Sequence, residues 1–224
     1  MHTAIAAKIM ERYPIQDRER FLFGSILPDG AVSGNGHWRC AAAAGKQTVY
    51  LAGFRRKYGI HMMTDDLLLG YYLHLVQDLL FRQYLQTLPG WKVSRRYVKM
   101  LHADYERLNG LLTAEYDLQK IVSGIAVQDY EPVLDDRVEY DAEALLAGIR
   151  SDVNAVIGRQ PVFFSMERAR EYIQCAAEKS LEELGVLPSG RSVIEEMNIT
   201  WDWEKQRLPV RISGKLRRIA RGKV

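Results

Sequence analysis

The stretch at residues 64–87, TDDLLLGYYLHLVQDLLFRQYLQT, constrains the fold of this chain more than any other. Thr64 is placed to cap the start of a helix, and Asp65 and Asp66 follow in its first turn. Residues recur at intervals of three and four, as on the buried face of a helix: Leu67, Gly70, Tyr71, His74, Asp78, Phe81 and Leu85. We therefore expect a long buried helix, in which Gly70 lets another backbone come close.

Two polar side chains interrupt this apolar face. His74 and Asp78 are four residues apart, so their Cβ atoms would lie roughly 5–6 Å from each other on a helix. A buried carboxylate is costly unless it is paired or binds a metal ion. One interpretation of His74 is a core histidine hydrogen-bonded to a backbone carbonyl. The other is that the HxxxD pair aims two metal ligands inward.

Helical periodicity dominates the rest of the chain, whereas clean strand alternation is nearly absent. The segments predicted to be helical are residues 3–13, 17–27, 46–58, 94–117, 139–158 and 165–185, with a weaker helix at 191–205. Residues 28–38 are rich in glycine and predict a loop, and residues 127–136 predict a short strand or an extended loop. We expect an all-α fold, an irregular multi-helix bundle formed by residues 1–208.

Composition narrows the class of protein. A hydrophobic fraction of 47% and a charged fraction of 26% are typical of an ordinary globular domain, and a net charge of +3 does not by itself indicate nucleic acid. Two distant cysteines, Cys40 and Cys175, predict neither a disulfide framework nor a zinc ribbon. The sequence contains no recognisable secretory signal and no membrane span, so we expect a cytoplasmic protein.

Residues 209–224 form a basic C-terminal tail without acidic residues. Such a tail fits a solvated terminus, or else weak contact with anionic lipid or nucleic acid.

Three further residues carry groups that can bind metal. Asp29 lies in a Pro-Asp-Gly turn, where an aspartate often bonds its own backbone. His37 lies in the glycine-rich loop, and His2 lies at the start of the sequence, where many chains fray. Each has a purely structural interpretation when taken alone.

Taken together, these residues resemble the zinc-dependent phospholipase C family, and most closely its bacterial branch; the wider superfamily includes single-strand-specific nucleases. The resemblance covers roughly residues 2–117 and is carried by His2-Thr3, Ile5-Ala6, Phe21-Leu22, Gly24 to Asp29, His37, Gly70-Tyr71, His74-Leu75, Asp78 and His102 to Tyr105.

The resemblance implies a helical fold around zinc. It implies that Asp29, His37, His74 and Asp78 hold one ion, and that His2 and Asp78 hold a second. Zinc in such a site polarises a phosphoryl oxygen and activates water. Asp29 is then also the candidate general base.

The sequence departs from the phospholipases at their third zinc site, because His102 is the only histidine downstream of Asp78. One or two zinc ions are therefore expected rather than three. For His102 itself we favour a core position on the helix at residues 94–117, against a replacement ligand or a substrate contact.

The resulting expectation is a zinc-dependent phosphoester hydrolase, phospholipase C-like or phosphodiesterase-like, acting on a small phosphoester or a phospholipid head group. The alternative is a non-catalytic helical metal-binding module that engages a partner through the basic tail. A nuclease would need aromatic platforms for the bases, for which Trp38 and Tyr71 are the candidates.

Overall fold

The computed structural model describes residues 1–43, 45–134 and 137–202. Within them the α-helices are α1 His2–Arg12, α2 Arg18–Gly24, α3 Leu51–Tyr58, α4 Asp66–Thr87, α5 Arg95–Tyr116, α6 Leu118–Ser123, α7 Ala142–Val153 and α8 Met166–Val186. The strands are β1 Ala31–Ser33, β2 Arg39–Ala43, β3 Lys46–Val49, β4 Glu139–Tyr140 and β5 Trp201–Asp202. Short 3₁₀ helices are η1 Leu27–Gly30, η2 His61–Met63, η3 Leu187–Ser189 and η4 Glu196–Asn198.

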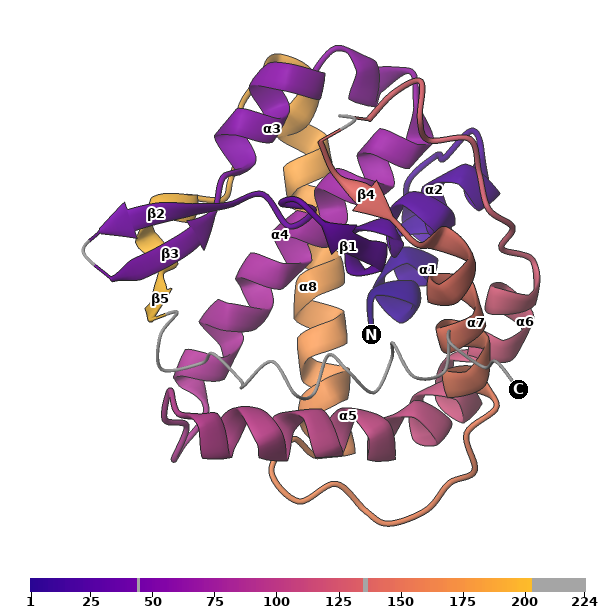
Figure 1. Cartoon of the computed structure of the whole chain (residues 1–224), viewed down its shortest axis with the longest axis vertical. Helices are drawn as coiled ribbons and strands as arrows, with labels where there is room; N and C mark the ends of the chain where they lie inside the picture. The colour runs from indigo at the N-terminus through magenta and orange to yellow at the C-terminus, as the bar shows by residue number, and fades with distance from the viewer. Residues whose placement is uncertain (44, 135–136, 203–224) are drawn as a thin grey trace, which may run out of the picture.

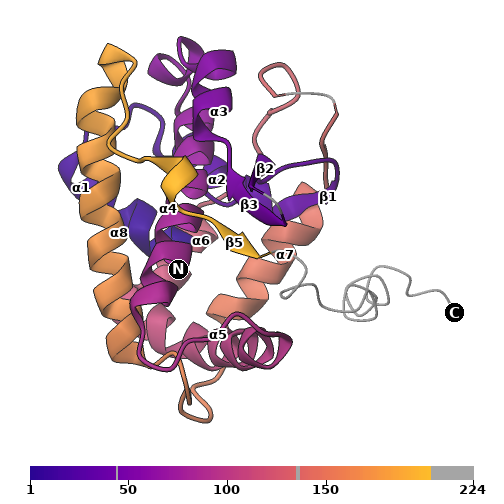
Figure 2. The same ribbon diagram turned by 90° about the vertical axis from the view of Figure 1, so that its left-hand side faces the viewer.

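Helix α4 is the long buried helix that the sequence predicts. It runs through the middle of the molecule beside α8, while α5 crosses near one end of both helices (Figures 1 and 2). The predicted cap is wrong by one residue. Asp65, not Thr64, has the extended backbone of an N-cap, and its carboxylate accepts a hydrogen bond from the N–H of Leu67 at 2.9 Å. Arg20 forms an ion pair with Asp65 at 2.8 Å, which ties α2 to this end of α4.

The predicted close approach at Gly70 is confirmed, and its partner is α2. A Cβ atom on Gly70 would lie 2.2 Å from the carbonyl oxygen of Phe21, and one on Gly24 would lie 2.1 Å from that of Leu67. The two backbones therefore touch without any side chain between them. This contact places the end of α2 and the following η1 directly against α4.

The prediction of a purely all-α fold is wrong, although the protein is mostly helical. Strands β1 and β4 form an antiparallel pair, and β2, β3 and β5 form a second antiparallel sheet. The predicted helix at residues 46–58 is β3 followed by α3, because Tyr50 has a non-helical backbone (φ −89°, ψ 73°). The side chain of Thr48 is buried and donates to the carbonyl of Glu196 at 2.7 Å.

The predicted weak helix at residues 191–205 is also wrong over the described residues. Only η4 is helical there, and Gln47 of β3 pairs with Trp201 of β5. The basic tail at residues 209–224, and the domain boundary expected at residue 208, lie outside the described residues.

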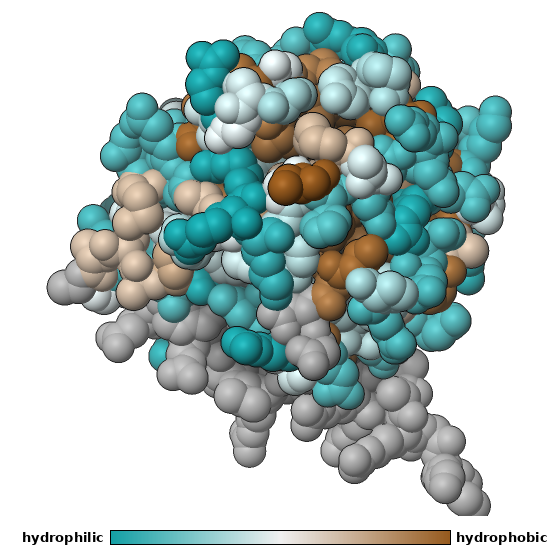
Figure 3. Space-filling model, turned by 90° about the horizontal axis from the view of Figure 1, so that it is seen from above, coloured by the Kyte–Doolittle hydropathy of each residue, from teal (hydrophilic) through white to brown (hydrophobic). Residues whose placement is uncertain are grey.

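The apolar side chains gather inside the molecule. Those of α1, α2, α4 and α8 contribute to one cluster of buried residues. The face seen from above is largely hydrophilic, and its apolar atoms form separate patches (Figure 3). Among the residues that the structure describes, no helix combines the length and apolar character needed to cross a membrane.

Asp104 on α5 anchors the segment that leads into α8. Its carboxylate is buried and accepts hydrogen bonds from the backbone N–H groups of Val162, Phe163 and Phe164 at 2.6–2.8 Å and from Arg107 at 2.9 Å. Burial alone would raise the pKa of Asp104, but these hydrogen bonds outweigh it and lower the pKa.

We expect Asp104→Ala to lower the free energy of unfolding by about 3–5 kcal/mol, because Arg107 and three backbone N–H groups lose the buried carboxylate that they bond. Since the folded state lowers the pKa of Asp104, its stabilising effect is present above the ordinary carboxyl pKa of about 4 and is lost as the pH falls. Urea denaturation of Asp104→Ala and wild type at pH 7 and pH 3 measures both effects. The exposed neighbour Glu106 provides the control, because Glu106→Ala should change stability little. A difference between Asp104→Ala and wild type that did not shrink at low pH would contradict this role.

Candidate metal centre

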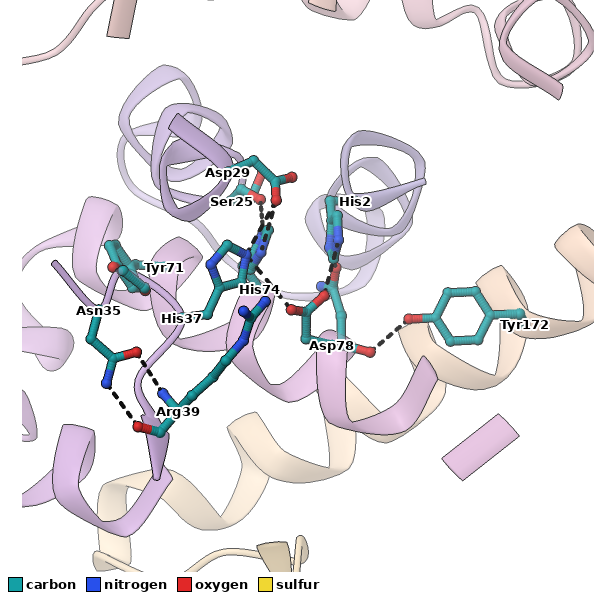
Figure 4. Close-up of polar contacts among 12 residues, drawn as sticks. His2, Ser25, Asp29, Asn35, His37, Arg39, Tyr71, His74, Asp78 and Tyr172 are labelled. Carbon is teal, nitrogen blue, oxygen red and sulfur yellow. Dashed lines mark hydrogen bonds and ion pairs between the residues drawn. The ribbon is translucent and has the colours of Figure 1, made fainter. Parts of the chain in front are cut away.

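Five side chains from four segments meet beside the middle of α4. His74 and Asp78 come from α4, His2 from the first turn of α1, Asp29 from η1, and His37 from the loop between β1 and β2 (Figure 4). Two sets have ligand atoms that all lie within 4.8 Å of one another, namely His2, Asp29 and His74, and His37, His74 and Asp78. The structure thus brings together all five residues that the sequence analysis singled out.

Only one of the two ring nitrogens of His74 has a hydrogen-bond partner among the described residues. Its ring is fully buried, and its Nδ1 lies 2.9 Å from the carbonyl oxygen of Ser25. A carbonyl can only accept, so Nδ1 carries the proton and Nε2 offers its lone pair to the site. Within the described residues Nε2 is buried without a hydrogen-bond partner, 3.8 Å from Oδ1 of Asp29. A buried nitrogen with a free lone pair beside a carboxylate is a group that can bind a metal ion.

His2 is oriented in the same way. Its Nδ1 lies 2.8 Å from the amide oxygen Oε1 of Gln77, and its Nε2 lies 3.6 Å from Oδ1 of Asp78. Its ring stacks on that of His74 with centroids 4.0 Å apart. Burial, followed by the nearby His74, lowers the pKa of His2 to about 4, so the imidazole is neutral at pH 7. Neutral imidazole is the form that binds metal.

The two carboxylates are ionised. Partial desolvation alone would raise the pKa of Asp29 and of Asp78, but the neighbouring histidines, His74 first, outweigh it and lower both. For His37, burial lowers the pKa, but the hydrogen bond to Asp29 and the charge of Asp78 together raise it. The site therefore pairs two carboxylates with three imidazoles, a donor set that suits zinc.

The spacing of the ligand atoms also fits zinc. Two ligands that each lie about 2.0–2.2 Å from a tetrahedral ion are roughly 3.3–3.6 Å apart. The Nε2 atom of His37 lies 3.3 Å from Oδ1 of Asp29 and 3.7 Å from Oδ2 of Asp78. Because His2 faces the other oxygen, Oδ1, the carboxylate of Asp78 turns one oxygen to each histidine. This arrangement suits a carboxylate shared between two ions.

The loop that carries His37 is anchored to α4 by a hydrogen bond. The hydroxyl of Tyr71 on α4 donates to the carbonyl of Gly36 and lies 2.9 Å from the hydroxyl of Tyr140 on β4. Tyr71 is fully buried. The β1–β4 pair thus holds one end of the loop, and the hydrogen bond from Tyr71 to Gly36 holds its middle.

Sequence reasoning missed the residues that orient the ligands. Gln77 is adjacent to Asp78 in sequence but bonds His2, from which it is 75 positions away, and Ser25 acts through its backbone carbonyl. No local pattern reports such pairs. The core position favoured for His102 is wrong: its side chain is exposed on α5, and its ring lies 5.9 Å from that of Tyr105.

Comparisons of the chain with protein-family models, with curated proteins and with solved structures found no match. What the site can do therefore has to be inferred from its own geometry and chemistry.

Proposed function

We propose that this protein is a metal-dependent phosphoester hydrolase that holds one or two zinc ions between α4, α1, η1 and the β1–β2 loop. The observation that carries the proposal is the buried, unpartnered Nε2 of His74 facing two ionised carboxylates and two further imidazoles. A purely structural cluster would satisfy that nitrogen with a hydrogen bond.

The resemblance to the zinc-dependent phospholipase C family suggests how the residues would divide between two ions. Asp29, His37, His74 and Asp78 would hold one, and His2 with the second oxygen of Asp78 would contribute to the other. When bound, zinc supplies a Lewis acid that polarises a phosphoryl oxygen and lowers the pKa of water.

Asp29 is the residue best placed to accept a proton. Its side chain is 51% exposed, in contrast to the buried His74, so it lies where the site opens to solvent. Its lowered pKa means that the carboxylate is ionised at neutral pH. We assign Asp29 a dual role as ligand and general base.

The substrate class that this chemistry supports is a small phosphoester or a phospholipid head group. A single-strand nuclease is less well supported, because neither aromatic candidate offers a free face. Tyr71 is fully buried, and Trp38 packs against Phe54 and Tyr58 with ring centroids 5.2 and 5.9 Å away.

The proposal is tested with a panel of phosphomonoesters, phosphodiesters and phospholipids, assayed with added zinc and after chelation. We expect hydrolysis of at least one class, its loss on chelation and its recovery with zinc. His61→Ala should retain full activity, because His61 is exposed on η2 and belongs to neither ligand set. A well-folded, zinc-loaded protein that hydrolyses nothing would favour the alternative, a non-catalytic metal-binding module whose basic tail engages a partner.

Gln77 provides a finer prediction. Gln77→Leu keeps a side chain of similar size but removes the oxygen that holds Nδ1 of His2. We expect about 10- to 100-fold weaker zinc binding, which is the usual cost of losing a residue that orients a ligand. Competition against a fluorescent zinc indicator measures the change. An unaltered affinity would mean that His2 does not ligate.

A further inference from the structure

A positively charged side chain reaches the same site from the sheet. Arg39 is the first residue of β2 and follows His37 by two positions. Its side chain is half-buried and extends toward the cluster formed by His37, His74 and Asp78 (Figure 4). None of the roles assigned above uses this guanidinium group.

The backbone of Arg39 is fixed in place. The side chain of Asn35 accepts from the N–H of Arg39 at 2.8 Å and donates to its carbonyl at 2.8 Å (Figure 4). Trp38, between His37 and Arg39, has a φ of 49°, in the left-handed region that a bulky residue rarely adopts. The Trp38 ring packs on Phe54. Strain of this kind persists where the surroundings enforce it, and it is common at functional sites.

The electrostatic surroundings of Arg39 are those of the candidate centre. Burial lowers the pKa of Arg39, the carboxylates of Asp78 and Asp29 raise it, and Arg82 lowers it. Arg82 is on α4, one turn after Asp78, and its guanidinium stacks over the ring of Trp201 at 5.1 Å. A second fixed positive charge therefore stands near the first.

Binding a metal ion does not require an arginine beside the ligands, whereas binding an anionic group does benefit from one. The two charges of a divalent ion would be offset by Asp29 and Asp78, with the imidazole of His2 neutral at pH 7. The guanidinium group of Arg39 adds a positive charge beside these carboxylates. Arginine presents a planar fork of N–H donors that matches the oxygens of a phosphate group.

We propose that Arg39 binds the non-bridging oxygens of the phosphate group of the substrate. This inference rests on the proposed hydrolase function and names the residue that would recognise the anion. Arg39 would thereby hold the phosphorus atom near Asp29 and the ligand set.

The test uses inorganic phosphate as the probe and the full-length, zinc-treated protein. Isothermal titration calorimetry compares phosphate binding by wild type, Arg39→Ala and Arg39→Lys, and elemental analysis gives the zinc content of each. Arg56→Ala is the matched control, because Arg56 is exposed on α3 and bonds the hydroxyl of Tyr50 instead. Circular dichroism establishes that each variant is folded.

We expect Arg39→Ala to bind phosphate about 10- to 100-fold more weakly with unchanged zinc content. Arg39→Lys should fall between it and wild type, since it keeps the charge but not the fork. Arg56→Ala should match wild type. A wild type that does not bind phosphate, or an Arg39→Ala that binds it as tightly as wild type, would overturn the inference.

The experiments distinguish a failure of the Arg39 proposal from a failure of the hydrolase proposal. If phosphate binding depends on Arg39 but no ester is hydrolysed, the phosphate site stands and the hydrolase proposal falls. If esters are hydrolysed and Arg39→Ala retains the wild-type KM and phosphate affinity, the role of Arg39 falls while the hydrolase proposal stands.

Discussion

Asp78→Asn is expected to weaken zinc binding and phosphoester hydrolysis by more than about 100-fold. Loss of a residue that only orients a ligand costs up to about 100-fold, and loss of a ligand itself should cost more. The carboxylate of Asp78 turns one oxygen to His2 and the other to His37, at 3.6 and 3.7 Å. An amide offers one neutral oxygen and an N–H₂ group that repels a cation. Both parts of the site therefore lose a ligand through a single substitution of nearly equal size.

The measurement is zinc affinity by indicator competition, together with kcat/KM on the best substrate of the panel. Asp66→Asn is a suitable control, because Asp66 lies on the same helix but bonds the backbone N–H of Asp17, outside either ligand set. Asp66→Asn should leave zinc affinity unchanged. If Asp78→Asn bound zinc as tightly as wild type, Asp78 would be excluded as a ligand. The proposal of a carboxylate shared between His2 and His37 would then be wrong.

Gly70→Ala is expected to destabilise the fold by about 3 kcal/mol or more, at the upper end of the range for overpacking. The new methyl group would lie 2.2 Å from the carbonyl oxygen of Phe21 and 2.9 Å from the backbone nitrogen of Ser25. These are backbone atoms, which cannot rotate away, so α2 and α4 would have to separate. Because the carbonyl of Ser25 holds Nδ1 of His74, such a shift would also disturb the candidate centre.

Chemical denaturation compares Gly70→Ala with Gly148→Ala. Gly148 lies within α7, and no atom lies within 4 Å of the position that its Cβ would occupy. Alanine there should raise stability by about 0.5–1 kcal/mol, because it is the better helix former. Equal effects at the two glycines would mean that α2 and α4 are not in backbone contact.

The local features of the fold were largely predictable from the sequence. A helix begins close to residue 17, as predicted, where Asp17 caps α2 by accepting from the N–H of Arg20 at 2.9 Å, and the apolar face of α4 is buried as its periodicity predicts. At the start of α4, each of Thr64, Asp65 and Asp66 is of a residue type that commonly caps helices. Only the tertiary ion pair with Arg20 selects Asp65.

The sheets were not predictable by the same means. Strand β3 is short and its burial does not alternate cleanly; it pairs with the adjacent strand β2 and also with β5, near the end of the described residues. So short a strand leaves little periodic signal of its own. Gln77 escaped notice because it acts through a hydrogen bond to His2, which is 75 positions away.

The convergence of the five candidate ligands followed from the family resemblance rather than from spacing. Spacing alone placed only His74 and Asp78 on one face of a helix. His2, Asp29 and His37 each had an adequate structural explanation in isolation, and their meeting depends on the α2–α4 contact and on the anchored β1–β2 loop.

The most direct test of the central claim is the zinc content of purified protein before and after zinc titration, with His74→Ala and His61→Ala measured alongside. We predict one or two zinc ions per chain in wild type and in His61→Ala, and a loss of at least one ion in a folded His74→Ala. A wild type that holds no metal and gains none on titration would contradict the proposed centre.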